Sequence, residues 1–241
     1  ILPFIKIIFL KTDNMIQIDK NFKAAINILS SNKIFYWVGH GSLLGIKREN
    51  KLIEWDHDID LCIWDKDNKR EKVIKILEEN GFKYRSDLGF GKKFDQMSFD
   101  KAGGRRVDIN FYLQGETKSG EKIAFIKWGY VDNFFMKILN AISNSENYKS
   151  RFSFVIKKLK FLQPAALKFK KLLIEKNFFY KFAGYQQPMR LLNDFEILDF
   201  HGIKINIPSN SEKYLEYIYG SNWRTPIKKF NWWKTKNLKN D

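Results

Sequence analysis

Cysteine is nearly absent from the 241-residue sequence, in which Cys62 stands alone. A single cysteine excludes an internal disulfide and a zinc site built from several thiolates, and it favours a reducing compartment. Apolar runs of the roughly 20 residues that cross a bilayer are also missing. The apolar opening, residues 1–10, is short and is interrupted by Pro3 and Lys6. We interpret it as a packed strand or helix and expect a cytoplasmic protein.

Acidic residues are few relative to basic ones, and the net charge is +16. The excess is concentrated in residues 151–241, which carry 18 Lys and Arg against 7 Asp and Glu. A basic surface implies an anionic partner, such as nucleic acid, the phosphates of a nucleotide, an acidic glycan or a membrane. Compositional drift explains the same excess equally simply, so charge alone does not select the partner.

Apolar and aromatic residues are plentiful: 44% of the chain is hydrophobic, with 22 Phe, 10 Tyr and 7 Trp, enough for a full core. Apolar periodicity predicts helices over 20–30, 70–80, 164–176 and 212–219, and strands over 34–38, 59–64, 96–99, 106–113, 122–128 and 203–207. Interleaved strands and helices predict an α/β (mixed α+β) fold with a mixed sheet flanked by helices. We expect a catalytic core over 1–150 and a basic, mainly helical region over 151–241 packed on it.

Three aspartates alternate along the sequence at Asp56, Asp58 and Asp60. On a strand, alternate side chains point to the same face, so the three carboxylates would gather there. Carboxylates this close repel one another and raise their pKa values unless a cation is present. Mg²⁺ or Mn²⁺ suits such oxygen ligands and keeps coordination positions for substrate phosphates. The apolar neighbours of these residues favour a half-buried strand over a solvated acidic turn.

Asp108 lies inside another apolar strand pattern, 106–112, and is the candidate third carboxylate. Gly41 and Ser42 follow a predicted strand, where glycine lets the backbone approach a phosphate and Ser42 can cap the next helix. Lys47 and Arg48, one turn later, could add charge-assisted bonds to a diphosphate. Gly-Ser followed 16 and 18 residues later by Asp-x-Asp predicts one metal-phosphate site, because the Gly-Ser backbone and the aspartates would bind the same metal-bound phosphate.

A specific resemblance follows from these motifs. The run Gly41-Ser-Leu-Leu-Gly-Ile-Lys-Arg48, then Ile53-Glu-Trp-Asp-His-Asp-Ile-Asp60, resembles the central motif of the LicD/fukutin family. The family's C-terminal element resembles Ile207-Pro208, Tyr214-Leu215, Tyr219-Gly220, Trp223 and Pro226, so the matched motifs run from about Tyr36 to Pro226. The sequence departs from the pattern at His40, Glu54 and His57. None of these departures removes an expected metal ligand, although His40 bears on the donor pocket.

The resemblance implies a nucleotidyltransferase-like fold and a metal-dependent phosphotransferase. The enzyme would transfer phosphocholine or an alditol phosphate, such as ribitol phosphate, from a CDP-linked donor to a sugar hydroxyl of a glycan or lipid-linked glycan, with release of CMP. Asp58 and Asp60 would hold Mg²⁺ or Mn²⁺ on the diphosphate. Asp108 would be a third ligand or the base for the hydroxyl proton, and Asp56 would orient ligands or substrate.

Other functions share parts of this pattern. A nucleotidyltransferase acting on RNA or a small molecule would also use Gly-Ser and Asp-x-Asp, and the net charge would suit RNA. The form Trp-Asp-x-Asp-Ile-Asp and the C-terminal motif argue against that reading, and nucleic acid is not the expected partner. A glycosyltransferase with Asp-x-Asp would not require Gly-Ser. A non-catalytic glycan- or membrane-binding relative would often have lost one of the acids.

The stretch 151–181 holds nine Lys and Arg against one acid, Glu175. From Pro164 onward its apolar and basic residues separate onto two helical faces: Ala166, Phe169, Leu172 and Leu173 on one, and Lys168, Lys170 and Lys171 on the other. Two interpretations stay open. The apolar face packs on the core, or the helix lies in the headgroups of an anionic membrane, at its inner face.

Overall fold

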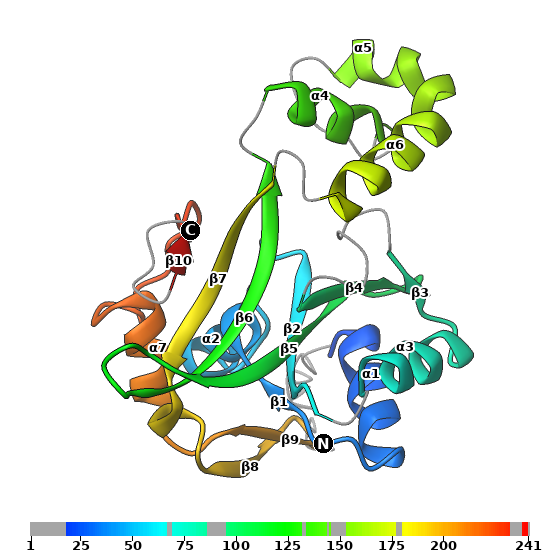
Figure 1. Ribbon diagram of the computed structural model, residues 1–241. Helices are drawn as coiled ribbons and strands as arrows, with labels where there is room; N and C mark the ends of the chain where they lie inside the picture. Colours follow the sequence, from blue (N-terminus) through cyan, green and yellow to red (C-terminus); the bar gives the residue numbers. More distant parts are fainter. Residues whose placement is uncertain are drawn as a thin grey trace, which may run out of the picture.

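The chain folds around a mixed β-sheet (Figure 1). The computed structural model describes residues 18–66, 69–85, 95–131, 134–143, 145, 153–176, 180–231 and 238–240, so the apolar opening of the chain lies outside it. The strands follow the order β1-β2-β5-β6-β7-β10, with β4 paired to β5 and β3 to β4. Their bounds are Trp37–Val38 (β1), Asp58–Trp64 (β2), Lys83–Tyr84 (β3), Gln96–Asp100 (β4), Arg106–Glu116 (β5), Lys122–Val131 (β6), Tyr180–Pro188 (β7) and Leu238–Asn240 (β10).

Strands β2 and β5 run parallel, and the other pairs formed by the described strands are antiparallel. Strand β2 has a neighbour on each side, β1 and β5, and its residues Ile59, Leu61, Cys62 and Ile63 are all fully buried. The parallel register aligns Asp60 with Asp108 and Asp58 with Arg106. This register, rather than sequence spacing, brings the distant acidic residues together.

Helix α1 (Lys20–Ser31) begins at Asp19, whose carboxylate accepts the amides of Asn21 at 2.8 Å and Phe22 at 3.2 Å. Such caps satisfy amides that lack partners within the helix. Its buried face follows the predicted helical spacing: Phe22, Ala25, Ile26 and Leu29. The remaining helices of the core are α2 (His40–Glu49), α3 (Lys69–Glu79) and α7 (Ser211–Tyr219). Helix α1 contacts α3 and β5, and α7 contacts α2.

A separate hairpin, β8 (Phe195–Phe200) and β9 (Ile203–Pro208), closes the side of the core next to α1. Its turn, His201-Gly202, has positive φ at both residues, +51° and +83°, the backbone that two-residue hairpin turns favour. Phe200 meets Phe22 of α1 edge to face, with 5.6 Å between ring centroids. The hairpin therefore fixes α1 against the sheet.

Three helices are inserted between β6 and β7: α4 (Phe134–Ser143), α5 (Ser153–Lys158) and α6 (Gln163–Glu175), with the short 3-10 helix η2 (Leu159–Leu162) before α6. Figure 1 shows them grouped beyond the ends of the two long strands. They have a small core of their own, formed by Met136, Leu139, Ala166 and Leu173. None of the helices in the described ranges has the length and apolarity to span a bilayer.

The mixed sheet flanked by helices is confirmed, but the region after residue 150 differs from the sequence prediction. The helices expected over 164–176 and 212–219 correspond to α6 and α7, and the strand expected over 203–207 corresponds to β9. The sequence did not predict β7, which returns to the sheet beside β6, or β8, which pairs with β9. Helix α4, which precedes residue 150, packs on α6, which follows it. The expected division at residue 150 therefore passes through one helical unit. The pairing of β6 with β7 determines where the helical unit begins and ends, and local periodicity in the sequence gives no sign of that pairing.

Candidate active site

Aspartates from two strands lie on one face of the sheet. Asp58 and Asp60 are alternate residues of β2, and Asp108 of β5 lies beside Asp60 in the parallel register. Aligned residues of neighbouring parallel strands point to the same face, so the three carboxylates are neighbours. Asp56 joins them from the turn before β2, and its Oδ2 lies 2.6 Å from the position that a Cβ would take at Gly41. The structure thus brings together all four predicted acidic residues.

Gly41 and Ser42 fasten α2 to β2. The amide of Gly41 donates to Asp60 Oδ2 at 3.1 Å, and the amide of Asp60 donates to Ser42 Oγ at 2.9 Å. The expectation that Ser42 caps the helix is wrong, because Gly39 is the N-cap and Ser42 lies buried inside α2. Its hydroxyl oxygen instead accepts the hydrogen bond from the amide of Asp60 on β2. The amide at the start of α2 faces Asp60, where the helix dipole favours negative charge.

The electrostatics of the cluster favour a cation. Burial, and then the charge of Asp58, raise the pKa of Asp56 to about 7. Burial raises the pKa of Asp60, reinforced by the charges of Asp58, Asp108 and Asp56. The pKa of Asp108 is raised to about 6 by burial, against the opposing effect of Arg106. Repulsion among the carboxylates thus adds to the effect of burial, and a bound cation would relieve both.

Arg106, which sequence reasoning missed, supplies positive charge to this cluster. Its Nη2 lies 2.7 Å from Asp58 Oδ2, and its Nε lies 3.1 Å from Asp108 Oδ1. Gln96 on β4 donates from Nε2 to Asp108 Oδ2 at 3.1 Å. Arg106 precedes Asp108 by two residues on β5, so the period of two could have placed both on one face. Arg106 therefore orients two of the predicted ligands.

A divalent cation fits the chemistry of this donor set. Within the described part of the chain, no three carboxylate, imidazole or thiol groups are placed closely enough to hold a metal ion together. The raised pKa values of Asp56, Asp60 and Asp108 nevertheless mark oxygen donors whose ionised forms a further cation would stabilise. Carboxylate oxygens are the ligands that Mg²⁺ prefers. Asp58 and Asp108 would have to exchange part of their bonding to Arg106 for the ion.

A cavity of about 320 Å³ adjoins the cluster through Gly41 and Asp56. Arg48 also lines it, held in an ion pair with Glu49 (Nε to Oε1, 2.7 Å), whereas Lys47 is half-buried outside its lining. Four aromatic side chains from two distant parts of the chain also line the cavity: Trp55, Tyr219, Trp223 and Phe230. The Nζ of Lys228, another lining residue, lies 5.5 Å from the ring centre of Trp55. The C-terminal motif thus becomes a wall of the site.

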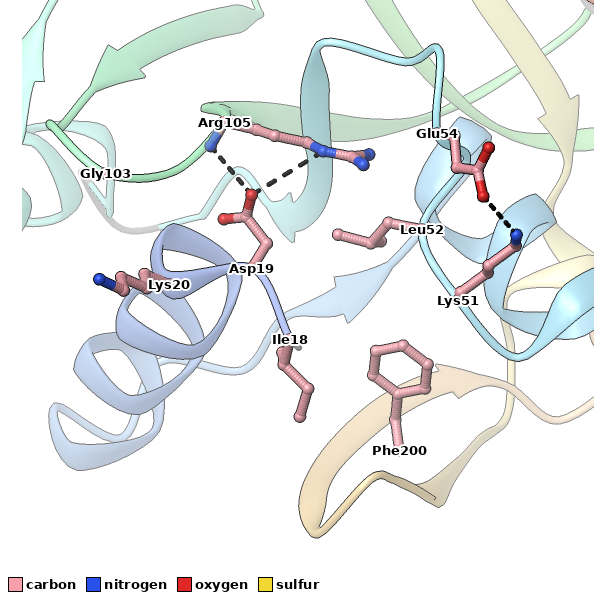
Figure 2. A pocket seen from close by; sticks show the side chains of 9 residues that line it. All are labelled: Ile18, Asp19, Lys20, Lys51, Leu52, Glu54, Gly103, Arg105 and Phe200. Carbon is pink, nitrogen blue, oxygen red and sulfur yellow. Dashed lines mark hydrogen bonds and ion pairs between the residues drawn. The ribbon is translucent and has the colours of Figure 1, made fainter. Parts of the chain in front are cut away.

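A second cavity, of about 360 Å³, is lined in part by Lys51, Leu52 and Glu54, which precede Trp55 and Asp56 in the chain (Figure 2). Arg105 extends across it, near Asp19, and donates from Nη1 to the carbonyl of Ile53 at 2.8 Å. Lys51 and Glu54 form an ion pair at 2.7 Å on its opposite wall. The charged groups are therefore satisfied by one another. Arg105 anchors the backbone that leads into Trp55 and Asp56, which assigns this cavity a structural role.

His40, the departure from the family motif, is buried at the start of α2 with φ of +45°. Its Nε2 lies 2.9 Å from the hydroxyl oxygen of Tyr112, and its ring lies near Tyr185, with centroids 5.1 Å apart. Burial lowers the pKa of His40 to about 4. A neutral imidazole held between two tyrosines is a packing element beside the carboxylates.

The chain is similar to proteins of known structure only at low sequence identity. The comparison with curated proteins returns no match. Among solved structures, the chain is similar to the lincosamide antibiotic adenylyltransferase LnuA in its lincomycin-bound crystal structure, with 12% identity, 82% of this chain and 85% of that chain covered, and a TM-score of 0.41. It is also similar to the antibiotic-resistance factor ANT(2'')-Ia in its solution structure, with 11% identity, 66% and 94% covered, and a TM-score of 0.30.

The model of one protein family matches residues 33–210, which include all four aspartates, Gly41, Ser42, Lys47 and Arg48. That model is described as LicD/FKTN/FKRP, nucleotidyltransferase domain. The match covers well over half of the chain. The chain therefore belongs to the LicD/FKTN/FKRP family and carries its nucleotidyltransferase domain.

Proposed function

We propose that the chain is an enzyme that transfers a phospho-alcohol group from a CDP-linked donor to a sugar hydroxyl of a glycan or lipid-linked glycan, with release of CMP. One observation carries the proposal. Four aspartates from β2, the turn before it and β5 converge at the start of α2, beside a cavity with aromatic walls. Such an arrangement can hold a charged diphosphate next to a ring-shaped group.

Asp58 and Asp60 would hold Mg²⁺ or Mn²⁺, with Asp108 as a third carboxylate. When bound, the ion would neutralise charge on the diphosphate and on the departing CMP. Arg106 directs Asp58 and Asp108 to one face, since it contacts both carboxylates. The amide of Gly41 fixes the carboxylate of Asp60 from the opposite side. Arg48, which lines the adjoining cavity, could bind the donor's phosphates, and Lys47 lies beside it on α2.

The proton of the attacking hydroxyl goes to Asp56 in this proposal. Asp108, the other candidate base, is 3% exposed and already bonded to Arg106 and Gln96. Asp56 is half-buried and lines the cavity. Burial and Asp58 hold its pKa near 7, a value at which a carboxylate can accept a proton at neutral pH. A general base must contact the hydroxyl that it deprotonates, and Asp56 lines the cavity in which the substrate would bind.

The cavity favours an alditol phosphate over phosphocholine. A trimethylammonium group binds by covering the faces of aromatic rings. The ammonium of Lys228 already lies over the ring of Trp55, and Arg48 adds a second cation to the lining. These two cations disfavour a third one beside the rings, whereas a cytosine base could stack there and a neutral polyol could form hydrogen bonds.

The test is product analysis with Mg²⁺ and a panel of CDP-ribitol, CDP-glycerol, CDP-choline, nucleoside triphosphates and a UDP-sugar. We expect CMP from a CDP-alditol, little from CDP-choline, and loss of release in Asp58→Asn. The matched control is Glu196→Gln, which neutralises an exposed acid on β8. Pyrophosphate release would replace the proposal with nucleotidyl transfer, UDP release with glycosyl transfer, and no release from any donor would indicate a non-catalytic relative.

A further inference from the structure

We propose that the helices inserted between β6 and β7 form a docking surface for an anionic membrane. This inference goes beyond the proposed function and does not depend on it. The helices project past the ends of β6 and β7 (Figure 1), where a flat surface can reach them. Their exposed side chains combine large apolar groups with lysine, and that combination carries the argument.

Many large apolar side chains of the insertion are exposed. The exposed fraction is 78% for Phe134, 75% for Phe161 and 69% for Phe154. Other large apolar side chains of the same helices are also exposed: Phe135, Ile138, Val155, Leu162, Phe169 and Leu172. Soluble proteins rarely leave so many large apolar groups together in water, and such patches mark interaction surfaces.

Part of this surface is continuous across two helices. The rings of Phe135 on α4 and Phe169 on α6 meet edge to face, with centroids 6.4 Å apart. Ile138 and Leu172 each follow three residues later on the same helices, so they extend the contact along both. The small core of the insertion, built from Met136, Leu139, Ala166 and Leu173, is separate from these groups. The apolar side chains are therefore left over after the helices have packed.

The charge of the insertion is almost entirely positive. Residues 134–143 and 153–176 hold eight lysines, no arginine and one acid, Glu175. Seven of the lysines are exposed: Lys137, Lys157, Lys158, Lys160, Lys168, Lys171 and Lys176. The ammonium of Lys158 lies 4.4 Å from the ring centre of exposed Phe154. Exposed lysine beside exposed phenylalanine suits an anionic bilayer, where lysine can contact the headgroups and phenylalanine the acyl chains.

One lysine of the sequence-based amphipathic pattern does not take part. Lys170 is 3% exposed and donates to Asn140 Oδ1 on α4 at 2.8 Å. It therefore joins α6 to α4 and cannot face a membrane. Phe169 and Leu172, which the pattern placed on one face with Ala166 and Leu173, are 44% and 49% exposed. The buried stripe of α6 is instead formed by Ala166, Lys170 and Leu173.

A membrane fits this surface better than a protein or nucleic acid does. A second copy of the chain would bring seven exposed lysines against seven more, which like charge opposes. Single-stranded nucleic acid is bound through stacking on aromatic rings and through arginine. The described part of the insertion has no arginine, tryptophan or tyrosine, and several of its exposed apolar groups are aliphatic.

The experiment is co-sedimentation of the full chain with vesicles of phosphatidylcholine, alone or with phosphatidylglycerol. We expect binding only to the anionic vesicles, with loss at high salt. Lys168→Gln with Lys171→Gln should weaken binding about 30-fold, since each lysine near the surface is worth about fivefold. Phe161→Ser should weaken it about tenfold through lost apolar burial.

Matched controls separate this face from general charge and hydrophobicity. Lys204→Gln with Lys213→Gln removes two exposed lysines from β9 and α7, and Ile197→Ser removes an apolar side chain that is 67% exposed on β8. Both should bind as the wild type does, and all variants should keep its circular dichroism and CMP release. Absence of binding at low salt, or equal losses in the controls, overturns the proposal. Concentration-dependent dimers, or RNA that competes better than vesicles, would assign the face to those partners instead.

Discussion

Replacement of Gly41 by Ala tests the active site with a single methyl group. A Cβ at this position would lie 2.6 Å from Asp56 Oδ2 and 3.5 Å from Asp60 Oδ2. Ordinary contact begins at 3.4 Å, so Asp56 would have to withdraw by about 0.8 Å. Gly41 lies in the first turn of α2, where alanine is the better helix former by about 1 kcal/mol. The fold should therefore survive while the carboxylates move.

The expected loss of activity is large relative to the displacement. A shift of about 1 Å in a catalytic group can reduce the rate about 100-fold, and we expect a loss of this order in CMP release for Gly41→Ala. The assay is kcat and KM for CMP release at saturating Mg²⁺, with the melting temperature measured on the same samples. Mn²⁺ affinity, followed by electron paramagnetic resonance, reports the carboxylates independently of turnover.

Gly39→Ala is the matched control. Its Cβ would meet Cys62 Sγ at 2.7 Å and Tyr214 Oη at 3.2 Å, an equally close approach that involves the core instead of the carboxylates. This variant should melt at a lower temperature and keep its Mn²⁺ affinity. Turnover of Gly41→Ala within threefold of the wild type, or equal loss of Mn²⁺ affinity in both variants, would refute the reasoning.

Three further predictions concern the metal and the carboxylates. Asp58→Asn and Asp60→Asn should each reduce CMP release by on the order of a thousandfold with the fold intact, because each removes a metal ligand. Asp108→Asn should cause a similar loss. Near-normal turnover of these variants at saturating Mg²⁺ would contradict the prediction. Calorimetry should show that a CDP-linked donor binds much more weakly in EDTA than in Mg²⁺, since ionised carboxylates repel a diphosphate; equal affinities would exclude the site. The pKa values of Asp56 and Asp108 are raised, to about 7 and about 6, so the stability they contribute is present below about pH 4 and is lost as pH rises through those values. The lowered pKa of His40 has the opposite effect on stability, which falls as pH drops from about 6.5 to 4. The stability of the protein alone therefore does not isolate the carboxylates. The quantity to measure is the rise in melting temperature caused by Mg²⁺, which should grow from pH 5 to pH 8. A rise that is constant over that range would show that these carboxylates do not bind the ion.

The four aspartates could be predicted from the sequence because their signal is local. Asp58 and Asp60 alternate in the apolar run that forms β2, so the period of two places both on one face, whereas Asp56 lies in the turn just before the strand. The core elements were predictable for the same reason: the buried positions of α1 and β2 repeat at their own periods. Gly41 and Ser42 were identified as partners of this group through their spacing, although the hydroxyl of Ser42 proved to serve β2.

What local pattern cannot report is pairing across the fold. Arg106 becomes the counterion of Asp58 only because β2 and β5 are parallel and in that register. Tyr219 and Trp223 become walls of the cavity next to Asp56 only because the chain returns after β9 to pack α7 on α2. Helices α4 and α6 form a unit of their own because β6 and β7 pair and isolate what lies between them. Periodicity fixes which face of a segment is apolar, whereas the partner that covers the face, or leaves it open as on the inserted helices, is chosen by the tertiary structure.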